Sequence, residues 1–538
     1  MDVSVKTISS LEKVRSRSQE MQTIANHKIL LGGEQFSYQQ MLLTDERTIL
    51  KVSVESPLAE YVQLYVVNDA VMDMPSHATC EDLDYLTGTP GIMPDILLPL
   101  EEQKGCILFN NYAVVWVEVK IPREYPAGKY PITICYDGEQ NLQETMMVEV
   151  LPLSLPEQEL KFTQWFHVDC IASAHHVPVY SEEHWALIDK YMQLAGELGM
   201  NMILTPIFTP PLDTQPGFYR PNTQLVRVGK KEGGYEFDFS MLKRWLDLAR
   251  KNGMRYFEMS HLFSQWGLKY CPNIYAGEEH LFGWHTPATS PEYKAFLEQL
   301  IPQLLEFLEG EGVKENCFFH LSDEPSFEHL DNYRYAYSVV RPLIGDMKIM
   351  DALSNVDFYD EGLLDVPVTA SNHIVPFLEK QIENQWVYYC TGQHTDVSNR
   401  FMAMSSARTR IMGLQMYKYN IKGFLQWGYN FYYSALALYP INPYVTSSAE
   451  RIFPSGDPFT VYPWKDGVVP SLRGKVFKEG LQDIQLCRLL ERYMSHEEVV
   501  AWLEERAGME LTFFDYPKNP EYLLKLNDAI KEELKGRV

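Results

Sequence analysis

Apolar and polar positions alternate in short runs between residues 28 and 155. The runs include QLYVV, NYAVVWVEVKI and ETMMVEVLPL, and turn-forming segments such as PREYPAGKY separate them. Alternation with period two indicates strands that bury one face, and turns at this spacing are typical of an antiparallel sandwich. We therefore predict a β-sandwich domain over residues 1–155. The proline-containing segment LPLSLPEQEL, at 151–160, is predicted to be the linker that leaves it.

The pattern changes after residue 160, where apolar strands alternate with segments of helical periodicity such as SEEHWALIDKYMQLAGELG. Eight strands are expected to begin near residues 162, 201, 254, 317, 347, 366, 385 and 423. Eight strand-and-helix units in about 280 residues favour a (β/α)8 barrel over a doubly wound sheet. We assign this barrel to residues 156–445. A hairpin with Gly233-Gly234 at its turn is expected as an insertion in it.

Residues 446–538 are irregular until SLRGKVFKEGLQDIQLCRLLERYM, whose apolar positions recur at helical spacing. We expect a helical C-terminal extension packed on the barrel. The predicted fold class is therefore α/β: a TIM-like (β/α)8 barrel, preceded by an antiparallel β-sandwich and followed by helices. The sandwich loop TGTPGIMPDILLPL, long and stiffened by prolines, is our candidate for reaching the barrel mouth.

Charge and hydropathy narrow the possible partners. The 538 residues include 47 Lys and Arg against 72 Asp and Glu, which gives a formal net charge of −25 at pH 7. Binding to a polyphosphate requires a basic surface, so we expect no nucleic-acid partner. No window approaches the 18 or so apolar residues of a membrane helix, and the first thirty residues contain no apolar signal core. We therefore expect no membrane partner.

The cysteines are far apart and include no CxxC pair. Reduced, mostly buried thiols in a cytoplasmic protein are our interpretation of this spacing. The cysteines are Cys80, Cys106, Cys135, Cys170, Cys271, Cys317, Cys390 and Cys487.

Candidate chemistry lies at the carboxyl ends of the predicted barrel strands, where barrel enzymes place their active sites. In chain order these ends are HVDC, TPIF, FEMSH, SDEP, DALSN, ASNH, YYCTG and QWGYN. The most acidic of them holds Asp323 and Glu324, and Pro325 then prevents the strand from continuing. We expect both carboxylates at the barrel mouth, where burial would raise the pKa of an acid catalyst. A solvated pair of loop carboxylates, or an acid at a helix N-terminus, is the alternative.

Paired carboxylates at a barrel mouth point to glycoside hydrolysis. A retaining glycosidase usually places its second carboxylate about 5 Å across the site. The last two strand ends contain no acid, and Asp169, Glu258 and Asp351 remain as distant candidates. Two adjacent acids without an opposing nucleophile fit a third arrangement, in which the 2-acetamido group of the substrate attacks C1.

A resemblance to a known family is carried by five segments: FHLSDEP, YYCTG, FLQWGYN, GDPFTVYP and SLRGKVFKEGLQD. Together they resemble glycoside hydrolase family 123 over most of residues 30–490. The resemblance implies a sandwich followed by a barrel, and exo-β-N-acetylgalactosaminidase activity through substrate-assisted catalysis. It further implies that Glu324 is the general acid and then the base. Asp323 would orient the acetamido nitrogen, so that the carbonyl oxygen attacks C1 and gives an oxazoline.

Aromatic strand ends complete the predicted sugar pocket. We expect Trp427 with Tyr429 or Tyr432 to form a platform and wall around the acetamido methyl group, and Tyr389 to hydrogen-bond its carbonyl oxygen. Core packing is the alternative for each of them. Further contacts with the substrate are expected from polar residues, because sugar hydroxyls require fixed donors and acceptors. These residues are His167, Asp169, Glu258, Asn372 and Asn430.

Other chemistries find less support. HVDCIASAHH gathers histidines, an acid and Cys170, but its spacing matches no zinc template, so we expect neither a metal nor another cofactor. GxGxxG, P-loop and GxSxG motifs are absent from the sequence. Cys390 is a candidate nucleophile, although cysteine is more often simply buried. A non-catalytic carbohydrate-binding or scaffold protein, and a glycosidase of different sugar specificity, stay as alternatives to the expected carbohydrate-cleaving enzyme.

Overall fold

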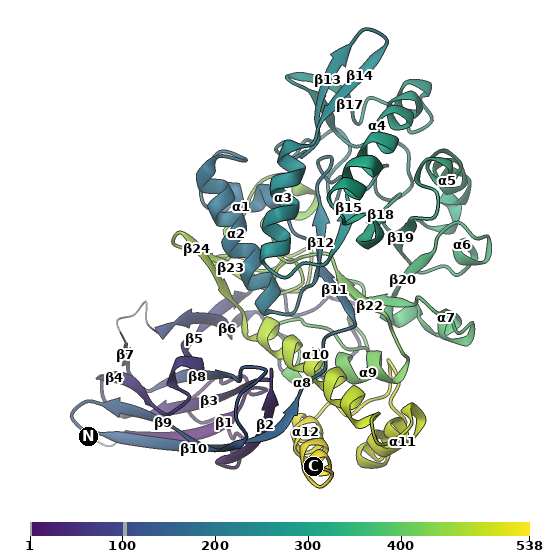
Figure 1. Cartoon of the computed structure of the whole chain (residues 1–538). Helices are drawn as coiled ribbons and strands as arrows, with labels where there is room; N and C mark the ends of the chain where they lie inside the picture. The colour runs from purple at the N-terminus through teal and green to yellow at the C-terminus, as the bar shows by residue number, and fades with distance from the viewer. Residues whose placement is uncertain (1–2, 101–104) are drawn as a thin grey trace.

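The computed structural model describes residues 3–100 and 105–538. A strand-rich N-terminal part, a central barrel and a C-terminal group of helices are visible in Figure 1. This architecture confirms the fold class that the alternating patterns predicted.

Two five-stranded sheets form the N-terminal sandwich. Their facing sides bury a common core that includes Tyr38, Val117 and Ile132. All strand pairs in the two sheets are antiparallel except β10 with β2, which run parallel. The first sheet contains, in spatial order, β1 (Ser4–Ser9), β3 (Gln35–Leu43), β8 (Tyr112–Lys120), β5 (Val62–Met72) and β6 (Gly91–Pro99). The second contains β2 (His27–Gly32), β10 (Leu142–Ser154), β9 (Gly128–Asp137), β4 (Thr48–Glu55) and β7 (Cys106–Phe109).

Eight parallel strands form the barrel, and each begins within two residues of its predicted start. Asn201 closes the barrel between the first two strands, because its backbone N–H donates to the Phe162 carbonyl and its side chain accepts from the Phe162 N–H. In chain order the strands are β11 (Lys161–Gln164), β12 (Met202–Thr205), β15 (Tyr256–Met259), β18 (Cys317–Phe319), β19 (Lys348–Leu353), β20 (Val366–Ala370), β21 (Trp386–Tyr388) and β22 (Gly423–Gln426).

Alternate residues of each strand point into the barrel, as the period of a strand requires. Met202, Val368 and Trp386 belong to the inner cluster. Their chain neighbours, such as Val387, belong instead to the cluster that includes the surrounding helices. The Trp386 ring lies so close to Gly423 that a Cβ atom there would be only 2.1 Å away. The barrel interior is therefore filled by side chains below its mouth.

Helices and short hairpins connect and cover the strands. Ser181 and Ser290 accept hydrogen bonds from backbone N–H groups in the first turns of α2 and α4, as good N-cap residues do. The predicted hairpin is present, with Gly233 at its turn in the left-handed region. The α-helices up to the last barrel strand are α1 (Val168–Ala174), α2 (Glu182–Glu197), α3 (Ser240–Lys251), α4 (Pro291–Gly310), α5 (Leu330–Ile344), α6 (Asp357–Asp360), α7 (Val375–Glu379), α8 (Ser406–Arg410) and α9 (Met412–Lys418). The hairpins are β13 (Arg227–Lys231) with β14 (Gly234–Asp238), β16 (Ile274–Ala276) with β17 (Glu279–Phe282), and β23 (Val461–Trp464) with β24 (Gly467–Pro470).

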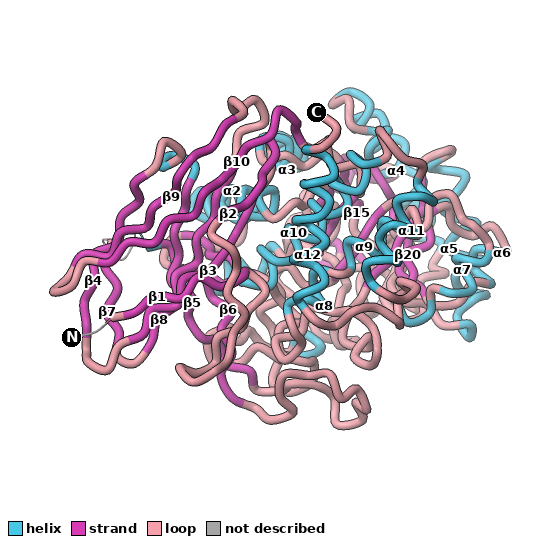
Figure 2. The backbone as a smooth tube through the Cα atoms, turned by 90° about the horizontal axis from the view of Figure 1, so that it is seen from below, coloured by secondary structure: helices cyan, strands magenta, loops and turns pink. Residues whose placement is uncertain are grey.

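The C-terminal helices are α10 (Leu472–Leu490), α11 (His496–Ala507) and α12 (Pro520–Lys535). Seen from below, α10 lies between the strand-rich sandwich and the barrel helices (Figure 2). One buried cluster joins Trp116 of the sandwich, Leu414 of α9 and Val476 of α10. The extension therefore packs on the sandwich as well as on the barrel, and the proposed division of the chain at residues 155 and 445 stays a prediction.

Candidate active site

A cleft opens at the carboxyl ends of the barrel strands, and Asp323 and Glu324 both line it. Asp323 is half-buried, whereas Glu324 keeps part of its surface exposed. The remaining lining residues are Trp165, Leu212, Asp213, Trp266, Ala352, Tyr388, Cys390, Thr391, Leu425, Trp427 and Phe453. The cleft thus combines carboxylates with flat aromatic side chains, a lining suited to a sugar ring.

Backbone hydrogen bonds fix the turn that carries the two acids. The Asp323 carbonyl accepts from the Trp266 N–H at 3.1 Å, and the Glu324 N–H donates to the Ala352 carbonyl at 3.1 Å. Glu324 has a φ of 45°, a left-handed conformation that is strained for a residue with a side chain. Trp266 and Asp213 share this feature, with φ of 51° and 36°. Strained residues therefore cluster at the cleft.

Both acids hold their protons more tightly than ordinary carboxyl groups. Burial, and then the neighbouring Glu324, raise the pKa of Asp323 well above its usual value, against the opposing charge of His320. Desolvation by the crowded walls also raises the pKa of Glu324, while a 2.5 Å hydrogen bond from the Tyr388 hydroxyl opposes that rise. Two adjacent carboxyl groups under these conditions are suited to share one proton.

The three distant acids named from the sequence are already paired. Asp169 accepts two hydrogen bonds from Arg220, at 2.7 and 2.8 Å. Glu258 and Asp351 lie within hydrogen-bond distance of the two ring nitrogens of His320, at 3.0 and 3.1 Å. All three carboxylates are almost fully buried and none lines the cleft. They are therefore not placed to attack a sugar.

One group of side chains near the catalytic acids has atoms of the type that bind metals, but it is a poor metal site. Atoms of His261, His320 and Asp351 lie within 4.8 Å of one another. Both His320 nitrogens already face carboxylate oxygens, and Asp351 also accepts hydrogen bonds from the Tyr333 hydroxyl and from two backbone N–H groups. We therefore interpret the group as a hydrogen-bonded cluster.

A larger groove, of about 760 Å³, lies beside α2, α3 and the β13–β14 hairpin. Its polar side chains are largely used within the protein: Arg244 pairs with Glu182, and Gln224 bonds to the backbone of Tyr275. The groove lacks the adjacent acids of the cleft. We therefore place the active site in the cleft.

Comparison with known proteins agrees with this geometry. The glycoside hydrolase 123 catalytic domain matches residues 165–490, more than half of the chain. The chain belongs to glycoside hydrolase family 123. A family 123 glycoside hydrolase from Clostridium perfringens, solved in a study of glycolipid glycan hydrolysis, aligns with 99% of this chain and 98% of its own length, at a TM-score of 0.74 and 16% identity. At that identity the likeness shows a shared fold.

More remote structures align only loosely. The β-D-glucuronidase of Dictyoglomus thermophilum covers 89% of this chain and 97% of its own, at 9% identity and a TM-score of 0.34. A family 5 mannosidase of Rhizomucor miehei covers 68% and 97%, at 11% identity and a TM-score of 0.35. A search among curated proteins found no match. Family 123 membership makes this chain a glycosidase, and none of its helices in the described ranges has the length and apolar character needed to cross a membrane.

In this family 123 chain, the predicted aromatic wall is only partly formed by the expected residues. Trp427 lines the cleft, as expected. Tyr389 packs instead against Phe424 and Phe477, and it is 1% exposed. Tyr389 therefore lies outside the cleft, and the prediction that it hydrogen-bonds the acetamido oxygen is corrected. Tyr388, one residue earlier, points into the barrel and reaches the cleft.

Tyr429 and Tyr432 are also core residues. The Tyr429 hydroxyl donates to the Tyr191 carbonyl at 2.9 Å, and the Tyr432 hydroxyl donates to the Val461 carbonyl at 2.8 Å. Both side chains are at most 1% exposed. The prediction that one of them forms the wall is contradicted by this burial, and Phe453 and Trp266 occupy the cleft beside Trp427.

The polar residues predicted to bind hydroxyl groups mostly support the cleft from behind. Asn430 exchanges two hydrogen bonds with the backbone of His167, and the His167 ring faces the Trp427 carbonyl at 2.9 Å. Burial, and then the Arg220 charge, lower the pKa of His167 to about 3, so its ring is neutral. The prediction of direct contacts with sugar hydroxyls is therefore corrected for four buried residues, which support the cleft instead: His167, Asn430, Asp169 and Glu258. Asn372 is half-buried beside Gln393 and outside the cleft lining.

Sequence reasoning missed several cleft residues, among them Tyr388, Asp213, Trp165, Trp266 and Phe453. Tyr388 was discoverable from strand alternation, since it is two residues after the inward-facing Trp386. Asp213 lies in a long loop after β12 without periodic pattern, and Trp266 lies in the loop after β15. Burial raises the pKa of Asp213 to about 6, although a hydrogen bond from the Leu436 N–H opposes the shift. Cys390 lines the cleft as well, but burial raises the pKa of its thiol, which argues against a thiolate nucleophile.

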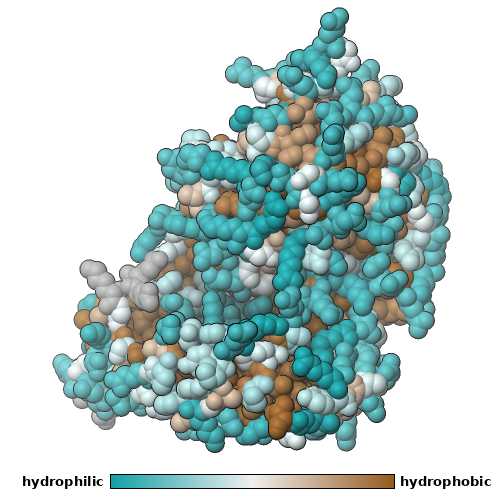
Figure 3. All heavy atoms as spheres, in the orientation of Figure 1, coloured by the Kyte–Doolittle hydropathy of each residue, from teal (hydrophilic) through white to brown (hydrophobic). Residues whose placement is uncertain are grey.

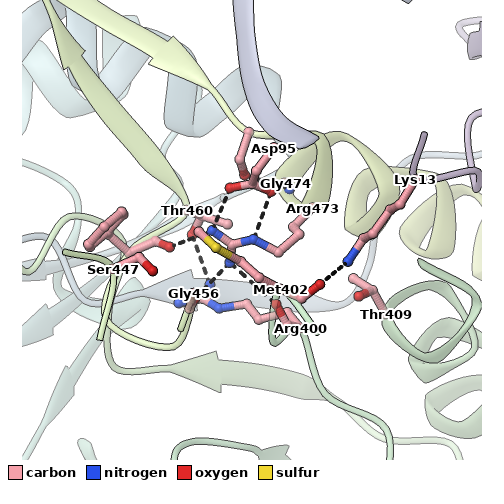
Figure 4. Close-up of polar contacts among 12 residues, drawn as sticks. Lys13, Asp95, Arg400, Met402, Thr409, Ser447, Gly456, Thr460, Arg473 and Gly474 are labelled. Atoms are coloured by element: carbon pink, nitrogen blue, oxygen red, sulfur yellow. Dashed lines mark hydrogen bonds and ion pairs between the residues drawn. The ribbon is translucent and has the colours of Figure 1, made fainter. Parts of the chain in front are cut away.

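A chain of buried contacts connects the sandwich to the wall of the cleft. Asp457 accepts a 2.9 Å hydrogen bond from the Trp427 indole. Arg400 donates to the Asp457 carbonyl, and Arg473 donates to the carbonyl of Gly456 next to it. Figure 4 shows Arg473 between Gly456 and Asp95, which belongs to sandwich strand β6. The sandwich thereby helps to position the segment behind Trp427.

The sandwich also reaches the mouth of the barrel, although not through the loop expected. Residues 91–99 of TGTPGIMPDILLPL form β6, whereas the segment before it extends to the barrel. His77 contacts the Thr391 hydroxyl at 2.8 Å, and Thr391 lines the cleft. Asp73 accepts hydrogen bonds from the hydroxyls of Thr446 and Ser448. Residues 73–87 therefore take the place predicted for the following loop.

Proposed function

We propose that this family 123 glycosidase releases a terminal β-linked 2-acetamido sugar, N-acetylgalactosamine in the first instance, with retention of configuration. The observation that carries the proposal is the adjacent pair Asp323 and Glu324 in the cleft, while the other acids predicted from the sequence lie outside it in ion pairs. A pocket walled by Trp266, Trp427 and Phe453 supports exo action on one terminal sugar.

The proposed reaction has two steps. Glu324, protonated, donates its proton to the glycosidic oxygen as the C1–O bond breaks, and the acetamido carbonyl oxygen forms the new bond to C1. Asp323 accepts the acetamido N–H hydrogen bond and stabilises the positive charge of the resulting oxazolinium ion. Glu324, now ionised, takes a proton from water as the water oxygen attacks C1, and the acetamido group is restored. The raised pKa of Glu324 supports its role as the acid.

Substitution of the two acids tests the assignment. With aryl 2-acetamido-2-deoxy-β-galactosides, we expect Glu324→Gln to lower kcat/KM by about 10²–10⁴-fold, the usual contribution of general acid–base catalysis. Asp323→Asn should be nearly as damaging. Glu328→Gln is the matched control, because Glu328 is an exposed acid four residues further along the chain. Wild-type protein that is inert on galacto, gluco and neutral glycosides, but binds them, would favour a carbohydrate-binding protein.

Asp213 allows a direct test of substrate assistance, because it is the third carboxyl group in the cleft. If the acetamido group is the nucleophile, a thiazoline analogue of the oxazoline should inhibit, and the matching neutral β-galactoside should be a poor substrate. Asp213→Asn should then retain measurable activity. Complete loss in Asp213→Asn, together with insensitivity to the thiazoline, would instead assign the nucleophile to Asp213 and leave glycoside hydrolysis standing.

We also propose that the enzyme works in a reducing compartment, the cytoplasm. All eight cysteines are free thiols, and five of them are buried: Cys135, Cys170, Cys271, Cys317 and Cys487. Immunoblotting of cell fractions tests this location, and recovery outside the cytoplasmic fraction would contradict it.

A further inference from the structure

We propose that Glu258, His320 and Asp351, named here the histidine clamp, position the turn that carries the catalytic acids and hold a positive charge beneath Asp323. The inference rests on the proposed function, since it concerns the ionisation that the reaction requires of Asp323. None of the three residues lines the cleft, so they act through their neighbours as positioning residues.

Each of the two contacts between His320 and a carboxylate needs a proton. Either both protons are on the imidazole ring, or one is on the ring and the other is on a partner carboxyl group. The Nε2 of His320 lies 3.0 Å from a Glu258 oxygen, and its Nδ1 lies 3.1 Å from an Asp351 oxygen. A neutral imidazole has only one N–H donor, whereas an imidazolium donates from both nitrogens. Two fully buried carboxylates without a cation would carry a large desolvation cost. The imidazolium between two carboxylates satisfies both requirements.

Groups from every adjoining element face His320. They are Trp165 after β11, Glu258 of β15, His261 after β15, Asp323 on its own loop and Asp351 of β19, while Thr163 of β11 and Tyr333 of α5 donate to the Glu258 and Asp351 carboxylates. His261 stacks on the His320 ring at 4.4 Å between centroids. Burial, and then the His320 charge, lower the pKa of His261 well below its usual value, so His261 stays neutral. One cation therefore faces two carboxylates in the clamp.

Each carboxylate of the clamp also holds a part of the active site. Asp351 accepts hydrogen bonds from the backbone N–H groups of Leu321 and Ser322, immediately before Asp323. Glu258 accepts a 3.1 Å hydrogen bond from the indole N–H of Trp165, which lines the cleft. The clamp thus fixes the turn that carries Asp323 and Glu324 relative to the Trp165 ring in the cleft lining.

The charge of His320 acts on Asp323 in the direction that the reaction requires. Asp323 must be ionised to accept the acetamido N–H hydrogen bond, but burial and the charges of Glu324, Asp351 and Asp213 oppose its ionisation, and His320 is the group that favours it. A cation below the turn favours the carboxylate form. Hydrogen bonds and charges of Asp351 and Glu258 outweigh burial and raise the pKa of His320 to about 9, so the cation persists at neutral pH.

Opposite changes of charge test the clamp. His320→Gln removes the cation, so we expect the acidic limb of the kcat/KM profile to move to higher pH, by on the order of one unit. Glu258→Gln removes an anion and should move the same limb to lower pH. Structural loosening alone would lower activity in both variants without shifts of opposite sign. Loss of activity with an unchanged limb in both would overturn the proposed charge effect.

His184→Gln is the matched control, because it removes another buried histidine away from the cleft. Burial lowers the pKa of His184 to about 4, so this substitution removes no charge and should leave the pH profile in place.

A second measurement does not depend on turnover. In ¹⁵N-histidine NMR spectra of the wild-type protein, one ring should have both nitrogens protonated up to about pH 9, and its signal should be absent from His320→Gln. A neutral His320 ring at pH 7 would overturn the clamp even if the enzyme is active. An imidazolium signal in a protein that hydrolyses no glycoside would retain the clamp and reject the proposed function instead.

Discussion

Tyr388 donates a 2.5 Å hydrogen bond to Glu324, and this single contact opposes the rise in the pKa of the proposed acid. The bond favours ionised Glu324, and its loss should raise the pKa of that carboxyl. Because the proposed acid must be protonated, Tyr388→Phe should move the basic limb of the kcat/KM profile to higher pH. Tyr389→Phe is the control, since that hydroxyl lies in the core. A shift in Tyr389→Phe, or none in Tyr388→Phe, would contradict the assignment.

The residue scale also shows where sequence reasoning is sufficient. Asp323 and Glu324 were predictable because a buried strand ends before them and a proline follows them. Tyr388 and Tyr389 were harder to separate, because a change of one residue in a strand moves a side chain to the opposite face. Asp213 gave no signal, since its position depends on the path of a long loop. Glu258 and Asp351 were noticed as acids, but their pairing with His320 arises only when three strands meet.

At the scale of elements, the barrel strands were predictable from their apolar runs. The segment between the last barrel strand and β23, which holds Trp427 in place, was not predictable in this way. This segment follows the last barrel strand and has no regular pattern up to β23. Asp457 within it bonds the Trp427 indole through one oxygen and the Gln426 amide through the other. Long-range contacts with Arg400 and Arg473, rather than local propensity, hold it in place.

This contact makes a prediction about substrate binding. Asp457→Asn keeps only one acceptor oxygen, whereas the two oxygens of Asp457 accept from the Gln426 amide and the Trp427 indole, so Trp427 should become less well fixed. We expect KM for the acetamido glycoside to rise several-fold, with a smaller change in kcat, because the acids themselves are untouched. Trp427→Phe removes the indole donor and provides the comparison. If Trp427→Phe raises KM and Asp457→Asn does not, Asp457 has no part in positioning the wall.

At the scale of the whole molecule, buried ion pairs join parts that are distant in the sequence. Glu118 of the sandwich pairs with Lys475 of α10, and Arg410 of α8 pairs with Asp483 of α10. The surface is different in character: the face in Figure 3 is mainly hydrophilic, in keeping with a net charge of −25. The sequence placed helices at the C-terminus, but only the fold shows that α10 lies between sandwich and barrel. The spacing of its apolar residues could not show that both the sandwich and the barrel pack against this helix.

The pair between Asp95 and Arg473 tests whether sandwich and barrel form one cooperative unit. Both side chains are 1% exposed, and Asp95 accepts from Arg473 at two positions and from the Tyr462 hydroxyl. Removing one partner of a buried pair leaves the other charge uncompensated and typically costs about 3–5 kcal/mol. Asp95→Asn should therefore lower the thermal midpoint while the melting curve stays a single transition.

Glu182→Gln is the control for this substitution, because it removes an acid from an exposed pair with Arg244. Exposed pairs contribute about 0–1 kcal/mol, so its melting curve should match the wild type. Differential scanning calorimetry of the full chain separates the possible results. Two resolved transitions in Asp95→Asn, with the activity of the barrel retained after the first, would show that the sandwich unfolds by itself. That outcome would contradict the role assigned here to the sandwich, because Trp427 would then be positioned without Asp95.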